Sequence, residues 1–269
     1  MRYDPIKDRL EHVADAHPLL RKLFYGLLHT LFLRAWYVRG AIRELLPEQA
    51  PARVLDAGTG FGQFAYFVAR RFPDAEVTAV DIKEDYLQRA RQFVERTPQR
   101  DQISFQVEDL TQLQLGGPFD LILSVDVMEH IEDDEAVFRN FARVLRSGGH
   151  VVINTPSDQG GSDVQEEGDT SFIEEHVRDG YSPQEMTAKL QRAGLEVVDV
   201  RYTYGTYGST AWRWLIQRPL LWLNTTWASI LLLPLYYAVM LPAGILLNWL
   251  DTRVTNKRGT GLFVIARKP

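Results

Sequence analysis

The chain of 269 residues contains no cysteine. It therefore has no disulfide, no thiolate zinc site and no cysteine nucleophile, while its redox compartment stays undecided. A surplus of positive charge is also missing, since the formal net charge is −5. Proteins that bind nucleic acid usually carry a basic surface, so the composition does not favour nucleic acid as a partner.

The amino terminus lacks the apolar run of a secretory signal. The segment MRYDPIKDRLEHVADAH alternates charged residues with single or paired apolar ones. A secretory signal needs an uninterrupted apolar segment, so we expect a cytoplasmic protein. The hydrophobic share of 45% is enough for one large domain with a sizeable core.

Short apolar runs alternate with helical patterns through much of the chain. The runs at 53–58, 76–81, 103–109, 119–127 and 150–156 are typical of buried parallel strands. We expect further strands at 195–205 and 261–268. The helix before the fifth run is expected to end at Gly148, and a later helix to begin at its cap Ser182. The alternation predicts an α/β fold, an open and mostly parallel sheet with helices on both faces.

A glycine-rich turn follows the first of these strands. The sequence LDAGTGFG places Gly58, Gly60 and Gly62 between a strand and a helix. Such a turn lets a ligand approach the backbone closely. Asp56 precedes the glycines, where it would repel a pyrophosphate and suits a cationic or zwitterionic ligand. This departs from the GxGxxG fingerprint of nicotinamide-dependent oxidoreductases, the main competing interpretation.

Acidic residues also stand at the ends of the next two strands. Asp81, at the end of the second strand, is placed to accept hydrogen bonds from a ribose diol. Asp109, at the end of the third, is placed to accept one from an adenine amino group. Because parallel strands end at the same edge of a sheet, the acidic tips indicate one nucleoside-binding site.

In combination, these segments resemble the class I S-adenosylmethionine-dependent methyltransferases. The resemblance is carried by VLDAGTGFG, VTAVDIKEDYL, FQVEDL and FDLILSVDVMEHIEDDEAVFRNFARVLRSGGHVVINTP, and it covers roughly residues 52–205 and the last strand. It implies a Rossmann-like seven-stranded, mostly parallel sheet, S-adenosylmethionine as the cofactor and methyl transfer as the activity.

The resemblance also assigns residues to the cofactor. It implies that Asp81 holds the ribose and Asp109 the adenine amino group. The residues that it implies around the methionyl part are Asp56, Gly58 and Gly60. The residues that it implies near the methyl donor, just past the fourth strand, are Ser124 and Asp126. The expected cofactor site is completed by Ala57, Gly62, Ile82 and Leu110.

Three residues are candidates for acid or base catalysis: His130, His176 and Tyr181. An oxygen acceptor usually needs a base, although nitrogen and carbon acceptors stay open. His130 lies in DVMEHIEDD, which is similar to the Glu-x-x-Glu-His that holds a divalent metal in ubiquinone-pathway O-methyltransferases. Asp126 replaces the first glutamate here, and we expect this segment to position its loop without a metal. His176 and Tyr181 stand near the end of a long acidic loop, 158–182, which is expected to turn over the site.

Charge is absent from a stretch of 32 residues, Pro219 to Leu250. It lies between the sixth and seventh strands of one sheet, so both of its ends must stay on one side of a membrane. Pro234 is expected to divide it into two pieces, each shorter than the ~20 residues that span a bilayer. We therefore expect an apolar helical hairpin that dips into one leaflet. Its aromatic residues and basic flanks favour an anionic lipid surface.

The expected organisation has four parts: an N-terminal helical cap at 1–50, a cofactor-binding core at 51–205, the hairpin insertion at 206–258 and the last strand at 259–269. Within the cap, residues 19–46 are expected to form an apolar helix that joins the hairpin in one membrane-docking surface.

The predicted function is methylation of a lipophilic small molecule, such as an isoprenoid, a quinone precursor or a lipid. The enzyme is expected at the cytoplasmic membrane face, with peripheral or monotopic attachment. One alternative is a soluble methyltransferase of a polar metabolite, with the hairpin as a homodimer interface. Another is a non-enzymatic binding module that retains the cofactor pocket.

Overall fold

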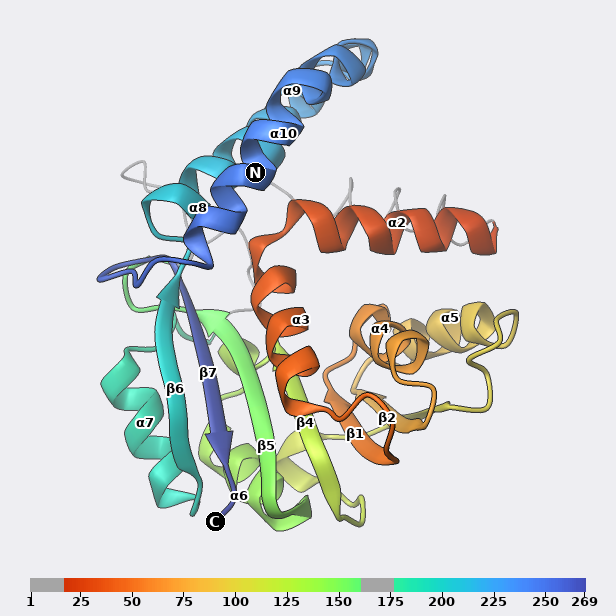
Figure 1. Cartoon of the computed structure of the whole chain (residues 1–269), viewed down its shortest axis with the longest axis vertical. Helices are drawn as coiled ribbons and strands as arrows, with labels where there is room; N and C mark the ends of the chain where they lie inside the picture. The colour runs from red at the N-terminus through yellow and green to blue at the C-terminus, as the bar shows by residue number, and fades with distance from the viewer. Residues whose placement is uncertain (1–16, 161–176) are drawn as a thin grey trace.

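A seven-stranded sheet forms the centre of the molecule, in the order β3-β2-β1-β4-β5-β7-β6 (Figure 1). The structure is a computed structural model that describes residues 17–160 and 177–269. Strands β1 to β5 pair in parallel, and β7 pairs antiparallel with both β5 and β6. The expected mostly parallel sheet is confirmed. The strands are β1 (Ala52–Ala57), β2 (Ala75–Asp81), β3 (Ile103–Val107), β4 (Phe119–Val125), β5 (Leu145–Pro156), β6 (Glu196–Thr203) and β7 (Gly261–Arg267).

The order of the strands positions a ligand site. β1 lies between β2 and β4, so the chain moves to one side after β1 and to the other side at β4. At such a switch point the loops after neighbouring strands diverge and leave a crevice at the carboxyl edge.

Two buried clusters cover the two faces of the sheet. Helices α3 (Leu33–Leu45), α4 (Gln63–Arg71) and α5 (Glu84–Val94) contribute to the cluster on one face. Helices α6 (Asp134–Val144) and α7 (Pro183–Arg192) contribute to the cluster on the other. The side chains that these helices bury recur at helical spacing, which is the pattern that predicted them.

One predicted helix end is wrong. Helix α6 ends at Val144 and not at Gly148, because Leu145 turns into extended backbone and pairs with Phe119 at the start of β5. Gly148 lies inside β5 with φ +75°, and its N–H donates to the carbonyl oxygen of Lys268 at 2.8 Å. The pairing of Leu145 with β4 therefore decides where the helix ends, and the glycine at position 148 does not.

The expected single helix over 19–46 is also wrong, because an extended residue, Phe32, interrupts it. Its φ of −90° and ψ of 118° separate α2 (Pro18–Leu31) from α3. The indole N–H of Trp36 donates to the carbonyl oxygen of Thr30 at 3.1 Å across this corner. As a result α2 lies over α4 and α5, while α3 packs on the sheet (Figure 1).

Residues 206–258, which we call the β6–β7 insertion, contain five helical segments. These are α8 (Thr206–Trp212), the π-helical turn η3 (Arg213–Gln217), α9 (Arg218–Thr225), the 3₁₀ turn η4 (Trp227–Leu231) and α10 (Leu233–Asp251). The expected division at Pro234 is wrong: the chain turns at the extended residue Thr226, and Pro234 lies in the first turn of α10. Pro234 fits there because a helix needs no N–H donor in its first turn.

The base of the β6–β7 insertion is fixed to the core and its tip is free. Asp251 is fully buried and accepts hydrogen bonds from the hydroxyl of Tyr37 at 2.8 Å and from the N–H groups of Gly205 and Gly208 at 3.0 Å each. The other end projects away from the sheet, beyond α2 (Figure 1). Helix α10 has the length and composition to cross a membrane, with 11% of its most apolar window buried.

Candidate functional site

The glycine loop after β1 folds across the end of β2. The N–H groups of Gly58 and Thr59 donate to the carbonyl oxygen of Val80, at 2.9 and 2.8 Å. The N–H of Gly60 donates to Oδ2 of Asp81 at 2.8 Å. Gly58 has φ +78°, and a Cβ there would lie 2.3 Å from a methyl group of Val127, whereas a Cβ on Gly60 would meet no atom within 4 Å. A ligand can therefore approach the backbone at Gly60.

Asp56 holds this loop from beneath. It is 2% exposed, and its Oδ2 accepts hydrogen bonds from the hydroxyl of Thr59 at 2.6 Å and from the N–H of Ala65 at 3.0 Å. Burial raises the pKa of Asp56 to about 6, against the lowering effect of these two donors. Asp56 thus shapes the turn, and its direct contact with a cofactor stays a prediction. Ala57 is fully buried, and its contact with a cofactor stays a prediction.

A carboxylate and two exposed apolar side chains meet at the ends of β2 and β3. Asp81 lies opposite Val107 in the β2–β3 register, and its Oδ1 accepts from the N–H of Lys83 at 2.9 Å. Ile82 is 67% exposed and Val107 54% exposed. A flat ring with a hydroxylated sugar fits this combination, because the ring covers the apolar groups and the diol reaches the carboxylate.

Asp109 caps the short turn η1 (Leu110–Gln112). Its Oδ1 accepts from the N–H of Thr111 at 2.8 Å and from its hydroxyl at 2.7 Å, so Oδ2 is the oxygen available to an amino group. The side chain of Leu110 is buried in the core, and only its backbone is available. Gly62 begins α4 with φ +75° and lies close to Ala90, which places it behind the ligand side of the loop.

The carboxyl end of β4 carries a constrained aspartate. Asp126 has φ +54°, uncommon for a residue with a side chain. Its N–H donates to the carbonyl oxygen of Asn154 at 2.8 Å, and its Oδ1 accepts from the Asn154 amide at 3.0 Å. Its Oδ2 forms an ion pair of 2.9 Å with Arg34 of α3. Ser124 is fully buried below it, so its side chain does not line the site.

The segment after β4 holds a buried glutamate. Glu129 is 2% exposed, and its Oε2 accepts from the hydroxyl of Thr155 at 3.1 Å. Burial, with a smaller contribution from the nearby Asp126 charge, raises the pKa of Glu129 to about 8. His130 is half-buried at the end of the turn η2 (Met128–His130). Within 17–160 and 177–269, no three His, Asp or Glu side chains are arranged to hold a metal ion.

Tyr181 is not placed for catalysis, which corrects its selection as a candidate. It is fully buried, and its hydroxyl donates to Oδ2 of Asp134 at 2.7 Å. Burial and this hydrogen bond raise the pKa of Tyr181 far above its usual range. Arg178 and Lys189 bind the same carboxylate oxygen, at 2.7 and 2.6 Å. Tyr181 therefore holds the segment before α7 against α6. His176 lies outside the described residues.

The N-terminal helices close the carboxyl edge from above, and no local sequence pattern indicates the residues that attach them. Arg21 is 1% exposed and donates from Nε to the hydroxyl of Tyr25 at 3.2 Å and from Nη2 to the carbonyl oxygen of Phe61 at 3.3 Å. Tyr25 donates its own hydroxyl to the same carbonyl oxygen. Helix α2 is thus attached to the glycine loop, and Arg34 attaches α3 to the end of β4.

Residues 54–149 match a family described as "Methyltransferase domain". A ubiquinone biosynthesis O-methyltransferase from Xanthomonas axonopodis pv. citri (strain 306) is 32% identical over 161 residues, which cover 57% of this chain and 66% of that protein. A demethylmenaquinone methyltransferase from Bacteroides fragilis (strain YCH46) is 30% identical over 154 residues, 56% of this chain and 59% of that protein. The match thus spans a little under two thirds of these relatives.

A solved structure supports the same fold. Phosphoethanolamine N-methyltransferase 2 from Haemonchus contortus, in complex with S-adenosyl-L-methionine, aligns with a TM-score of 0.61 at 20% identity. The alignment covers 97% of this chain and 60% of that one. The likeness therefore extends beyond the matched domain to the general arrangement of helices around the sheet.

Proposed function

We propose that this chain, which belongs to the class I S-adenosylmethionine-dependent methyltransferases, methylates a lipophilic small molecule at the cytoplasmic face of a membrane. The observation that carries the substrate and the location is the exposed apolar tip of the β6–β7 insertion. Relatives named for ubiquinone and menaquinone biosynthesis support an isoprenoid or quinone precursor as the acceptor class.

The residues at the carboxyl edge fit the cofactor. The open space at Gly60 would admit the methionyl part, Asp81 would accept hydrogen bonds from the ribose, and Ile82 would cover the adenine. Asp109 would accept a hydrogen bond from the adenine amino group. When bound, S-adenosylmethionine supplies a methyl group that the acceptor's lone pair takes, while the C–S electron pair stays on sulfur and the acceptor releases a proton. The protein's contribution is to align the two reactants and to exclude water.

The acceptor side lies between the end of β4 and the cap. Arg34 and Asn154 fix the Asp126 carboxylate there, and His130 stands at the rim of the same loop. Burial raises the pKa of Glu129 to about 8, so this carboxyl keeps its proton at pH 7 and does not serve as a base there. His130 and His176 therefore remain the proposed bases.

Large apolar side chains at the tip of the insertion face outward. Leu231 is 81% exposed, Leu235 73%, Val239 62% and Leu232 61%. Each such side chain gains about 1.5–3 kcal/mol when it leaves water. A cluster of them on one projection is typical of a surface that meets a membrane or another protein.

Four hydroxyl groups near the tip donate hydrogen bonds to backbone carbonyl oxygens within the insertion. The hydroxyls of Tyr236 and Tyr237 donate to carbonyl oxygens of the opposite arm, at 2.8 and 2.7 Å. Those of Thr225 and Ser229 donate to carbonyl oxygens of α9, at 2.9 and 3.1 Å. In hydrocarbon an unpaired polar group costs several kcal/mol, so this internal pairing makes the tip compatible with a lipid environment.

The topology supports a shallow insertion rather than a crossing. The lower part of each arm is packed on the protein, as the buried residues Ala211, Leu215 and Asn248 indicate. At the base of the insertion, Asp251 at the end of α10 is held by Tyr37 of α3 and by the N–H groups of Gly205 and Gly208. Because both arms lead back to strands of one sheet, the tip enters and leaves through the same face.

The membrane contact is tested by flotation with liposomes. We compare the intact chain with Leu231→Ser/Leu235→Ser, whose two side chains touch little of the fold. Val198→Ser on β6, a residue 57% exposed, is the matched control. The double variant is expected to bind liposomes at least about tenfold more weakly, since two leucines lose their transfer free energy, whereas the control binds like the intact chain. An intact chain that ignores liposomes and forms a dimer that the double variant cannot form would instead favour the soluble alternative with an apolar dimer interface.

Activity is tested with S-adenosylmethionine labelled in its methyl group and a lipid extract or a prenylated phenol as acceptor. We expect label in the organic phase, and none with Asp81→Ala, because that variant loses the ribose contact and the Gly60 anchor. Cofactor binding without turnover on any lipid acceptor would favour the binding-module alternative.

A further inference from the structure

One face of α10 is apolar from the tip of the β6–β7 insertion to its base. The exposed side chains on this face are Leu235, Val239, Pro242, Leu246 and Trp249. At about 100° per residue, they lie within about 80° of one another around the helix axis. The residues that α10 buries lie on the opposite side of the helix: Gly244, Asn248 and Asp251. The outer face of this arm is therefore a continuous apolar surface, which we call the α10 stripe.

The α10 stripe leads into a loop whose charged residues are all basic. Residues 252–260, which we call the basic loop, contain Arg253, Lys257 and Arg258 and no Asp or Glu. All three of these side chains are exposed. No carboxylate of residues 17–160 or 177–269 forms an ion pair with any of them. The basic loop therefore carries positive charges that the described part of the protein does not neutralise.

The backbone of the basic loop is fixed to the sheet at Asn256. This residue forms a β-bridge with Tyr202, and its side-chain amide donates to the carbonyl oxygen of Tyr202 at 3.4 Å. A Cβ on Gly205 would lie 2.0 Å from Oδ1 of Asn256, so the asparagine occupies the space that this glycine leaves. Lys257 directly follows the anchor. The loop thus presents its basic residues from a fixed backbone, which lowers the entropy cost of binding a partner.

The length of the α10 stripe matches one leaflet of a bilayer. At about 1.5 Å per residue, the helix from Leu235 to Trp249 is about 21 Å long. Half of the hydrocarbon core is about 15 Å thick, and each headgroup layer adds about 5–7 Å. An upright arm with Leu235 near the middle of the bilayer thus places Trp249 among the headgroups, the level at which tryptophan is enriched. The guanidinium of Arg253 lies 5.5 Å from the centre of the Trp249 ring, so it reaches the same level.

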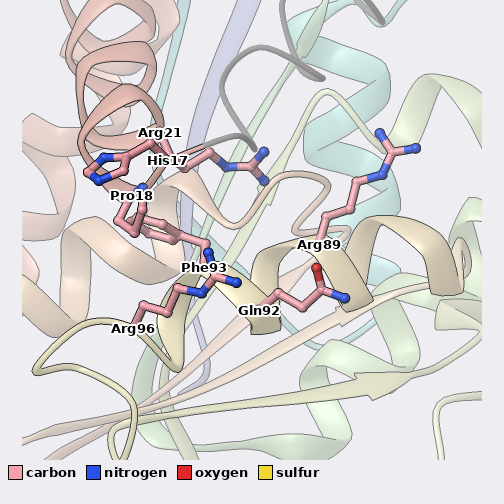
Figure 2. Close-up of a pocket in the computed structure, with 7 residues that line it drawn as sticks. All are labelled: His17, Pro18, Arg21, Arg89, Gln92, Phe93 and Arg96. Atoms are coloured by element: carbon pink, nitrogen blue, oxygen red, sulfur yellow. The ribbon is translucent and has the colours of Figure 1, made fainter.

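The arginines around the start of α2 (Figure 2) are less suited to an anion, because they already have partners within the protein. Arg21 is 1% exposed and donates hydrogen bonds to Tyr25 and to the carbonyl oxygen of Phe61. Arg89 lies 3.9 Å from a carboxylate oxygen of Asp85. The basic loop, in contrast, adjoins the arm that projects from the sheet, and its positive charges are unpaired.

We propose that the basic loop binds the phosphates of anionic phospholipids while the α10 stripe lies in the same leaflet. The proposal rests on the proposed function and deepens it, because it names the lipid class that the membrane contact selects. An anionic leaflet repels a protein of net charge −5 as a whole, so local cations must supply the attraction. Arginine and lysine donate charge-assisted hydrogen bonds to phosphate oxygens. A phosphate free in solution offers the loop the same oxygens but gives the α10 stripe no apolar partner.

The test compares binding of the full chain to two kinds of vesicle, phosphatidylcholine alone and phosphatidylcholine mixed with phosphatidylglycerol. The variant is Arg253→Gln/Lys257→Gln. The control, Arg100→Gln/Arg192→Gln, changes the net charge equally at two exposed arginines that precede β3 and β6, at the amino edge of the sheet. We expect the variant to bind the mixed vesicles about 25-fold more weakly, since each basic residue near an anionic leaflet contributes about fivefold. The control should bind like the intact chain. Binding to phosphatidylcholine alone, and the thermal unfolding midpoint, should stay unchanged for both.

Three outcomes overturn the proposal. A variant that matches the control on mixed vesicles shows that the basic loop does not bind the headgroups. An intact chain that binds inorganic phosphate in calorimetry but has no preference for mixed vesicles shows a site for soluble anions. An intact chain that binds both kinds of vesicle equally, and loses both in Leu231→Ser/Leu235→Ser, retains the membrane contact of the proposed function without the lipid preference. If the intact chain binds neither vesicle, the membrane contact fails as well, which distinguishes the two failures.

Discussion

Glu129 provides a quantitative test of the electrostatics around the site. The carboxyl is 2% exposed, and burial raises its pKa from 4.5 to about 8. Between these two values the folded protein holds a proton that the unfolded chain releases, so the stability falls with rising pH by about 1.4 kcal/mol per pH unit. At pH 7 this costs the fold about 3 kcal/mol. Glu129→Gln keeps the size and the acceptor oxygen for Thr155 and removes the titration.

The variant is therefore expected to be more stable than the intact chain by about 3 kcal/mol at pH 7, and nearly equal to it at pH 4.5. Urea unfolding followed by far-UV circular dichroism at several pH values measures this difference. Glu135→Gln is the control, because Glu135 is only partly buried and its hydrogen bond with Arg192 lowers its pKa, so its replacement brings no gain at pH 7.

An unchanged or lower stability of Glu129→Gln at pH 7 would refute this reasoning. It would mean that Glu129 is ionised in the folded protein and that a cation compensates its burial. The metal-binding interpretation of Asp126, Glu129 and His130 would then have to be taken up again.

Three further substitutions test the loop, the insertion and the acceptor side. Gly58→Ala places a methyl group 2.3 Å from a valine methyl of the loop after β4, so the affinity for S-adenosylmethionine in calorimetry should fall at least about tenfold, whereas Gly116→Ala, with no atom within 4 Å, should leave it unchanged. Asp251→Ala removes the shared acceptor at the base of the insertion and should lower the free energy of unfolding in urea by about 3 kcal/mol. Arg34→Ala releases the Asp126 carboxylate and should lower kcat/KM for the acceptor about tenfold with cofactor affinity unchanged; partial recovery in Arg34→Lys would support the role of the charge.

Local chemistry explains which parts of the fold could be predicted from the sequence. Buried parallel strands are short apolar runs, and a site at their carboxyl ends requires polar residues just where each run stops. Asp81 and Asp109 follow this rule: Asp81 ends β2, and Asp109 lies two residues beyond the end of β3, where it caps η1. The strand of 145–156 was predicted too short at its start, because pairing with β4 extends it through Gly148.

Contacts distant in sequence explain the parts that could not be predicted. Tyr181 ends a long acidic loop, and nothing near it in the sequence indicates that Asp134, 47 positions earlier, captures its hydroxyl. Arg34 is one of several basic residues in an apolar helical segment, and only the corner at Phe32 brings it to Asp126. Each error is thus a place where a tertiary contact decides the role of a residue.

The orientation of α2 leaves an apolar surface exposed next to the site. A pattern of alternating leucines and polar residues predicts an amphipathic helix but does not say which face is buried, and burial of the leucines is the usual outcome. Here the glycine loop presents the carbonyl oxygen of Phe61, and Arg21 with Tyr25 binds it. These contacts turn the polar face inward, so the same hydrogen bonds that cover the cofactor loop leave the leucines exposed. A protein that closes its site in this way exposes an apolar surface beside the site, and the membrane contact that we propose would cover that surface.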